Sequence, residues 1–268
     1  MALITINKET CNKCGICSIP CGLILFKEGA YPRPIPGIEQ YCMRCGHCVG
    51  VCPTGALTHA EMPDTPEIKK SLTISYEQCV QLIKSRRSIR EFKDKSVPAE
   101  EIERIIEAAR YAPTGHNYQE VRWLVINDRA YMDKVRKIGW DWLRWIMKSN
   151  PQMAEIFKGI DTMLDMGKDM FLQGAPAVVL TLGEKNSPIV TTDCVIALSY
   201  FDLLAKSAGL GCCWAGFMMM ASATYPDMIK ALALPENFVP HAALMVGYPE
   251  YRYHRIPGRK PANIVYRP

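Results

Sequence analysis

The chain lacks a continuously apolar run of the length that a membrane-spanning helix needs. Its longest stretch without charge, residues 207–226, contains three glycines and ends in proline, whereas a spanning helix needs about 20 mostly apolar residues. Residues 1–10 also lack the basic and apolar regions of a secretory signal. We therefore expect a cytoplasmic protein without a membrane-spanning segment.

Disorder and a disulfide framework are excluded by composition and by the distribution of cysteine. Hydrophobic side chains make up 49% of the 268 residues and charged side chains 22%, a balance typical of chains that bury a core. At this length we expect one large domain or two unequal domains. Eight of the 12 cysteines lie within the first 52 residues. Because no secretory signal precedes them, we expect these thiols to bind metal rather than to pair as disulfides.

The eight clustered cysteines form two copies of one spacing. The first copy is Cys11, Cys14, Cys17 and Cys21, and the second is Cys42, Cys45, Cys48 and Cys52, followed by Pro53. Three cysteines spaced three residues apart can place their thiolates around one face of a cubane cluster. The fourth cysteine follows four residues after the third, and its thiolate reaches another cluster. Zinc sites more often show paired arms separated by a loop. The spacing therefore indicates iron–sulfur clusters.

Residues 2–61 resemble a bacterial-type ferredoxin with two 4Fe-4S clusters. The resemblance implies crossed ligation, in which each cluster takes three cysteines from one copy and the last cysteine from the other. One cluster is then expected on Cys11, Cys14, Cys17 and Cys52, and the other on Cys21, Cys42, Cys45 and Cys48. We expect a ferredoxin-type domain over residues 1–61 and a polar, proline-containing linker over residues 62–75.

Beyond residue 75 the hydrophobic pattern alternates between helical and strand periods. Helical spacing predicts helices over residues 76–85, 96–111, 141–149, 155–171, 192–207 and 226–232. Strands are predicted over residues 122–127, 177–183 and 241–246, and the glycine-rich residues 209–217 are expected to begin another strand. The mixture predicts an α+β fold in which several helices cover a sheet.

Three segments of this part carry groups that suit a flat, phosphorylated ligand. Residues 86–92 hold three arginines and a serine, which can grip a phosphate by charge-assisted hydrogen bonds, although a solvated basic turn has the same composition. Residues 112–119 form a loop whose amides and hydroxyl can bind a heterocycle, and other helix-ending loops look similar. Residues 209–217 are rich in glycine, which lets backbone approach a ligand closely.

In this order and spacing the three segments resemble the FMN-dependent nitroreductase family, from about residue 77 to the carboxyl end. The resemblance implies a nitroreductase-like α+β sandwich over residues 76–268, with a mixed sheet surrounded by helices. It also implies a homodimer with FMN at the subunit interface. The residues that it assigns to FMN are Arg86, Arg87, Ser88, Arg90, Pro113, Thr114, Gly115, Asn117, Ala215, Gly216, Arg259 and Lys260. It assigns no side chain as a catalytic acid, base or nucleophile.

The two resemblances together suggest one redox function. Two one-electron clusters match the two electrons that FMN takes up, so we expect electrons to pass from the clusters to FMN. The reduced flavin would then transfer hydride to a small organic acceptor such as a nitroaromatic, a quinone or an activated alkene, with an external low-potential donor. Two alternatives stay open: a flavin that oxidises a substrate while the clusters export electrons, and a redox carrier or sensor without a substrate.

We expect no nucleic-acid partner, and the sequence contains no motif for a nicotinamide dinucleotide, although its use is not excluded. The formal net charge is +5, but two clusters add about −4 and a flavin phosphate about −2, so the loaded protein is near neutral. Residues 209–211 lack the further glycine and the acidic partner of a dinucleotide fingerprint. Tryptophan and methionine are frequent in residues 139–170, which either form a lid over the flavin or simply pack as helices. Because exposed low-potential clusters are sensitive to oxygen, we expect an anaerobic setting.

Overall fold

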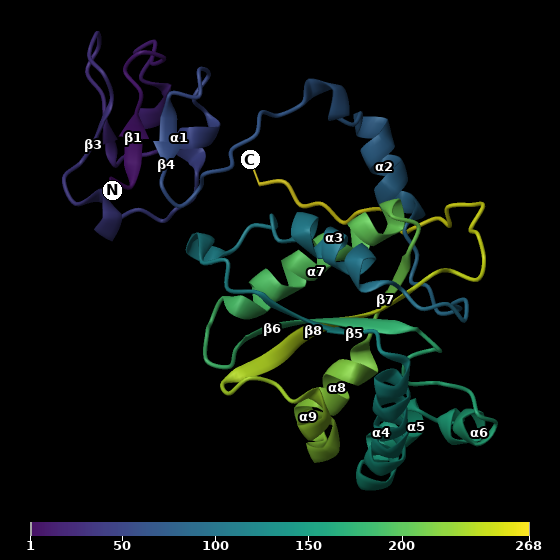
Figure 1. Cartoon of the computed structure of the whole chain (residues 1–268). Helices are drawn as coiled ribbons and strands as arrows, with labels where there is room; N and C mark the ends of the chain where they lie inside the picture. Colours follow the sequence, from purple (N-terminus) through teal and green to yellow (C-terminus); the bar gives the residue numbers. More distant parts are fainter. Residues whose placement is uncertain (1, 268) are drawn as a thin grey trace. The chain divides into compact units, whose positions relative to one another are not determined.

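The computed structural model describes residues 2–267, which form two compact units (Figure 1). The first unit extends to Thr73 and also takes in His116–Tyr118. The second unit comprises Ile74–Gly115 and the chain from Gln119 onward. In the described part of the chain, no helix combines the length and the apolar character needed to cross a membrane.

The first unit is built from very short elements. These are β1 (Ile4–Ile6), η1 (Ile16–Ser18), β2 (Ile24–Leu25), β3 (Arg33–Pro34), η2 (Ile38–Gln40), α1 (His47–Gly50), β4 (Leu57–His59) and η3 (Lys70–Leu72). Strand β1 pairs antiparallel with β4, and β2 pairs antiparallel with β3. Its buried apolar cluster is small and includes two of the predicted ligands, Cys17 and Cys48. Domains with so little core commonly depend on a bound metal for stability.

The cysteine repeat is also a repeat of backbone conformation. Lys13 and Gly15 adopt left-handed φ angles of 58° and 71°, and Arg44 and Gly46 adopt 54° and 72°. Gly15 precedes η1 and Gly46 precedes α1, so each copy turns sharply between its second and third cysteine. The turns place both third cysteines in the interior, each less than 10% exposed.

A four-stranded sheet forms the centre of the second unit. Its strands are β5 (Arg122–Ile126), β6 (Ala177–Glu184), β7 (Gly211–Trp214) and β8 (Phe238–Gly247), in the spatial order β5-β6-β8-β7. Each neighbouring pair is antiparallel, with Leu124 opposite Leu180 and Cys213 opposite Met245. A parallel pairing is added at the β7 edge by the bridge between Ser88 and Cys212.

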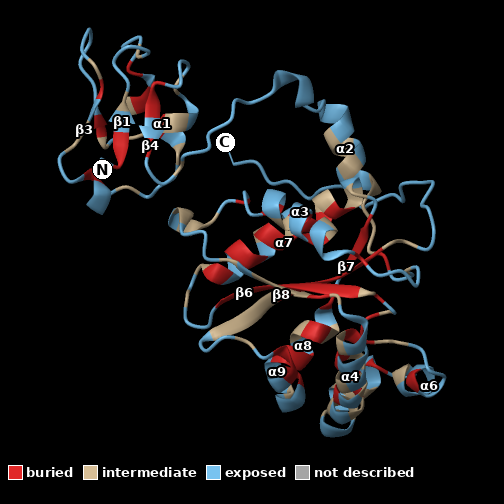
Figure 2. Cartoon of the chain, in the orientation of Figure 1, coloured by how far each residue is buried: buried red, intermediate tan, exposed pale blue. Residues whose placement is uncertain are grey.

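Helices cover both faces of this sheet (Figure 1). One face carries α3 (Ala99–Ala109) and α7 (Val190–Ser207), against which α2 (Tyr76–Ser85) packs. The other face carries α4 (Arg129–Ser149), α8 (Gly216–Thr224) and α9 (Pro226–Leu232), with α5 (Pro151–Ile156) and α6 (Ile160–Asp165) following α4. The side chains of β6 alternate between the two cores, so this strand is buried on both sides (Figure 2).

Several predicted element boundaries were wrong. Helix α4 begins at Arg129 rather than at residue 141, because the Asp128 side chain caps it by accepting from the Tyr131 amide at 2.8 Å. The single helix predicted over residues 155–171 is divided into α5 and α6, since Gly159 has a left-handed φ of 88°. Strand β8 extends beyond the predicted residues 241–246, and α8 was not predicted at all.

Candidate functional site

Four cysteines from both copies of the repeat line one cavity of the first unit. Cys11, Cys14 and Cys17 come from the first copy and Cys52 from the second, and Gly15 and Leu57 complete part of the wall. Strand pairing explains the meeting, because β1 leads into the first copy while β4 follows the second. The four thiols that face this cavity are those of the predicted crossed set.

The thiols that influence the pKa of the two buried cysteines, Cys17 and Cys48, fall into the same two groups of four as the predicted ligand sets. Burial raises the pKa of Cys17, and the Cys52, Cys14 and Cys11 thiols raise it further. Burial raises the pKa of Cys48 to about 11, and three neighbouring thiols act in the same direction, against a hydrogen bond with the Val49 backbone. Those neighbours are Cys21, Cys42 and Cys45. Each buried thiol therefore lies in the field of the other three members of its predicted set.

The donor set fits a cluster. Within residues 2–267, no three His, Cys, Asp or Glu side chains converge as they would around a single metal ion. A cubane binds each of its four thiolates at a different iron, so its ligands stand further apart than those of one zinc ion. Eight thiols in two groups of four are compatible with that wider spacing.

Cys52 receives several hydrogen-bond donors that favour its thiolate. Burial raises its pKa, but the amides of Thr54, Ala56 and Leu57 lower it, and the net shift is downward. The Thr54 hydroxyl adds a contact to Cys52 Sγ at 3.8 Å. Amides directed at a cysteine sulfur stabilise the metal-bound, charged form and tune the metal centre.

In the second unit, the arginine segment 86–92 runs beside strand β7. The Ile89 amide donates to the Cys212 carbonyl at 2.9 Å, and Ser88 forms a parallel bridge with Cys212. A Cβ atom on Gly211 would lie 2.4 Å from Ile89 Cγ1. The close approach that this glycine permits is therefore made by the arginine segment itself, whereas the sequence had suggested approach to a ligand.

Arg86 is held in the interior beside a single carboxylate. Its Nη1 lies 3.5 Å from Asp202 Oδ2, in a pair whose side chains are only 25% and 7% exposed. Burial raises the pKa of Asp202, while the Arg86 guanidinium and the Trp214 side chain lower it. Arg86 Nη1 is buried and makes no hydrogen bond within the described residues. A buried donor of this kind is suited to an anionic ligand.

A cavity of about 600 Å³ opens beside Arg86. Its cationic lining residues are Arg86, Arg87, Lys93, Lys206 and Arg252. Asp202 and Glu250 are the acidic residues in the same lining. Ser88 and Arg90 do not line this cavity. The positive charge of Arg90 and a hydrogen bond with the Ser88 side chain oppose the increase in the pKa of Cys213 that burial causes. The arginine segment thus provides cationic groups both to this cavity and near Cys213.

The loop that follows α3 is anchored to the first turn of α7. The Gly115 amide donates to both carboxylate oxygens of Asp193, at 3.1 and 3.2 Å, and the Thr114 hydroxyl oxygen accepts from the Gln119 amide at 3.1 Å. Pro113, Thr114 and Gly115 belong to the second unit, whereas Asn117 is grouped with the first. Sequence reasoning did not find Asp193, because it is 78 residues away from Gly115.

Ala215 and Gly216, which were predicted to place backbone near a flavin ring, differ in whether their backbone amides are already hydrogen-bonded. The Ala215 amide donates to the Ala243 carbonyl at 2.9 Å, and the Ala215 carbonyl accepts from Met219 at 3.1 Å. Gly216 begins α8, so its amide is among the first-turn donors that a helix leaves unsatisfied. A Cβ atom at Gly216 would meet no atom within 4 Å. Gly216 is thus the better placed backbone donor.

The predicted carboxyl-terminal residues are not brought to the cavity within the described chain. Arg259 and Lys260 are exposed, and the segment that contains them has no regular structure. Tyr251, Arg252 and Tyr253 line the cavity instead. Arg252 was missed, although an arginine between two tyrosines is a signal that could have marked it.

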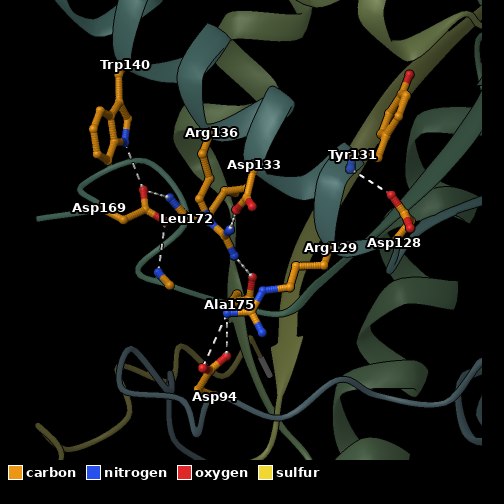
Figure 3. Close-up of polar contacts among 11 residues, drawn as sticks. Asp94, Asp128, Arg129, Tyr131, Asp133, Arg136, Trp140, Asp169, Leu172 and Ala175 are labelled. Atoms are coloured by element: carbon orange, nitrogen blue, oxygen red, sulfur yellow. Dashed lines mark hydrogen bonds and ion pairs between the residues drawn. The ribbon is translucent and has the colours of Figure 1, made fainter. Parts of the chain in front are cut away.

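The tryptophan- and methionine-rich insertion is tied to the rest of the unit by Asp169 (Figure 3). One oxygen of this carboxylate accepts from the Trp140 indole at 3.2 Å and from the Phe171 and Leu172 amides at 3.0 Å. The other oxygen accepts from the Gly174 amide at 2.9 Å and lies 3.2 Å from Arg136 Nε. Trp142 is fully buried, so the packing alternative holds for that residue. Trp145, Met163 and Met166 remain exposed.

Comparison with known proteins agrees with this division of the chain. The Nitroreductase family matches residues 83–248, and the 4Fe-4S binding domain matches residues 36–58. A protein of Archaeoglobus fulgidus named for NADH dehydrogenase and NAD(P)H nitroreductase activity is 29% identical over 184 residues, covering 65% of this chain and 87% of the relative. The polyferredoxin protein MvhB of Methanothermus fervidus is 39% identical over 83 residues, covering 29% of this chain and 18% of the relative.

The fold of the second unit is also found among solved structures. An FMN-bound nitroreductase of Desulfitobacterium hafniense DCB-2 aligns with a TM-score of 0.58 at 22% identity, covering 72% of this chain and all of that one. The family match spans more than half of the chain. The chain therefore belongs to the nitroreductase family and is a fusion of that domain with an amino-terminal, ferredoxin-type 4Fe-4S segment.

Proposed function

We propose that the chain is an iron–sulfur flavoprotein oxidoreductase that holds two 4Fe-4S clusters and one FMN and reduces a small organic acceptor. The observation that carries the proposal is the cavity lined by Cys11, Cys14, Cys17 and Cys52, in a chain whose second unit has the nitroreductase fold. The FMN bound in the Desulfitobacterium hafniense structure and the activity in the Archaeoglobus fulgidus protein's name support the flavin part.

The proposed division of labour follows the two units. Residues 1–61 would hold the clusters, residues 62–75 would link, and residues 76–268 would hold FMN. One cluster is assigned to Cys11, Cys14, Cys17 and Cys52, and the other to Cys21, Cys42, Cys45 and Cys48. Both groups of thiols have one buried member, Cys17 in the first group and Cys48 in the second.

The first proposed FMN contacts are between cationic side chains and the phosphate. Arg86 offers a buried Nη1 that is paired with Asp202 at 3.5 Å but makes no hydrogen bond within the described residues. Ser88 and Arg90 add a hydroxyl and a second guanidinium for the phosphate. The Gly216 amide at the start of α8 would orient the ring. When bound, FMN takes up electrons singly and delivers them to an organic acceptor as hydride. We assign the remaining predicted contacts, among them Asn117 and Arg259, to the same ligand.

The substrate class and the assembly state belong to the same proposal. We propose a nitroaromatic, a quinone or an activated alkene as acceptor, because hydride transfer from a flavin needs an electron-poor acceptor and no protein nucleophile. We also propose a homodimer and an external low-potential donor that reduces the clusters.

Anaerobic purification followed by assay of iron, sulfide and FMN tests the proposal. We expect about eight iron and one FMN per chain, and reoxidation of the reduced protein by an added quinone or nitroaromatic. The double variant R86Q/D202N removes the guanidinium without leaving a buried carboxylate unpaired. It should retain iron and lose FMN, whereas the exposed-site control R110Q should retain both. A protein with full iron that never binds added FMN would overturn the flavin assignment.

A further inference from the structure

His59 is a buried polar residue that the proposed function does not use. It is the last residue of β4, lies opposite Ile4 of β1, and is 2% exposed. A buried imidazole needs hydrogen-bond partners for both ring nitrogens. Its partners therefore indicate what the residue does in this small unit.

Those partners fix the tautomer of the ring. The Glu61 amide donates to His59 Nδ1 at 3.2 Å, so Nδ1 must present its lone pair. A neutral imidazole then carries its proton on Nε2. Nε2 lies 3.7 Å from Cys42 Sγ, which is within hydrogen-bond range for sulfur. The ring is therefore oriented to donate to a thiolate that we assign as a cluster ligand.

Arg44 holds the same cysteine from another side. Its amide donates to Cys42 Sγ at 3.4 Å, and its Nη1 donates to the Cys42 carbonyl at 3.2 Å. Its Nε pairs with the Glu61 carboxylate at 2.6 Å. Glu61 thus connects both donors of Cys42, through its amide to His59 and through its side chain to Arg44. The two donors to Cys42 Sγ, His59 and the Arg44 amide, thus belong to one linked network.

We propose that His59 is a positioning residue whose Nε2–H donates a hydrogen bond to the Cys42 thiolate. This hydrogen bond raises the reduction potential of the cluster on Cys21, Cys42, Cys45 and Cys48. The inference rests on the proposed two-cluster function. A hydrogen bond to a ligand sulfur stabilises the reduced cluster, which carries the greater negative charge.

The cysteine repeat makes this effect specific to one cluster. The two copies of the repeat are 31 residues apart, so the position that corresponds to His59 in the first copy is Glu28. Glu28 is exposed, and its carboxylate cannot donate a hydrogen bond. Cys52, in the other set, relies on backbone amides and a hydroxyl. His59 therefore separates the potentials of two clusters that otherwise have the same ligands.

The test is an EPR-monitored redox titration of the anaerobically purified full chain. In H59L we expect one midpoint potential to fall by about 59 mV, which is a tenfold change in a one-electron equilibrium, while the other midpoint stays constant. H59Q, whose amide can donate, should restore most of the difference. The control H47L alters an exposed histidine between Cys45 and Cys48 and should leave both midpoints unchanged.

A second measurement does not depend on the stability of H59L. Protein labelled with ¹⁵N only in the imidazole rings of histidine should show electron spin-echo modulation from one ¹⁵N at one reduced cluster, and H59Q should lack this signal. Two loaded clusters with unchanged midpoints in H59L, or no histidine coupling in the wild type, would overturn the role of His59. A wild-type chain that binds fewer than two clusters would instead overturn the proposed function, and this assignment with it.

Discussion

The crossed assignment of the cysteines predicts how pairs of substitutions combine. Cys14 is exposed, while Cys21 and Cys52 are both partly buried, so C14A/C52A and C14A/C21A are matched double variants. In the structure Cys14 and Cys52 line the same cavity, whereas Cys21 interacts with Cys48 of the other group. On the proposed ligation, the first variant therefore removes two ligands from one cluster, and the second removes one ligand from each.

The expected readout is the number of four-thiolate clusters per chain. Fully reduced wild-type protein should give about two spins, C14A/C52A about one, and C14A/C21A about none with all four thiolates in place. EPR spin quantitation, together with iron analysis and Mössbauer spectra, measures these values. Were ligation instead confined to each copy of the repeat, the two double variants would exchange their results. An intact cluster in C14A/C21A and none in C14A/C52A would refute the reasoning from the cavity.

Three further predictions concern the second unit. D169N should lower the free energy of unfolding of the second unit by about 2–3 kcal/mol, because the Arg136 side chain and several amides lose a charged acceptor. Thermal melts should show a decrease in Tm of about 5–10 °C. A decrease no larger than that of the exposed control D165N would contradict this prediction. G211A should cost about 1–3 kcal/mol and release FMN, because the new methyl group displaces the arginine segment; unchanged melting and unchanged flavin fluorescence would count against it. Alkylation of native protein at pH 8 should label Cys79 but not Cys194, whose burial raises its pKa to about 11 and leaves about one thiol in a thousand ionised; equal labelling by peptide mass spectrometry would be inconsistent with the structure.

Local signals in the sequence predicted the elements that local interactions build. Helix α2 has the predicted bounds, because Ser75 and Gln78 form a reciprocal capping box at its start. Helix α9 also matches, beginning at a proline in the first turn. Strand β6 was found within one residue, since its buried run is almost wholly apolar.

Features built from distant contacts could not be predicted in this way. Arg86 and Asp202 meet across 116 positions of the sequence, and Gly115 and Asp193 across 78. His59 resembles any other histidine until the pairing of β1 with β4 buries it beside Cys42. The cysteine spacing indicated clusters, but the grouping of Cys52 with the first copy came from family resemblance. That grouping stays a prediction, and the cavity that Cys52 shares with Cys11, Cys14 and Cys17 is the observation that supports it.

The interleaving of the two cysteine copies has a consequence for biosynthesis. On the proposed ligation neither site is complete when the first copy leaves the ribosome, since each still needs a thiol from the second. Both sites are then completed within five residues of one another, by Cys48 and Cys52. At 5–20 residues per second, the 195 residues from Cys52 to the end of β8 at Gly247 take about 10–40 s to synthesise. Iron–sulfur insertion can thus precede the formation of the β6-β8 centre, whose strands lie far downstream.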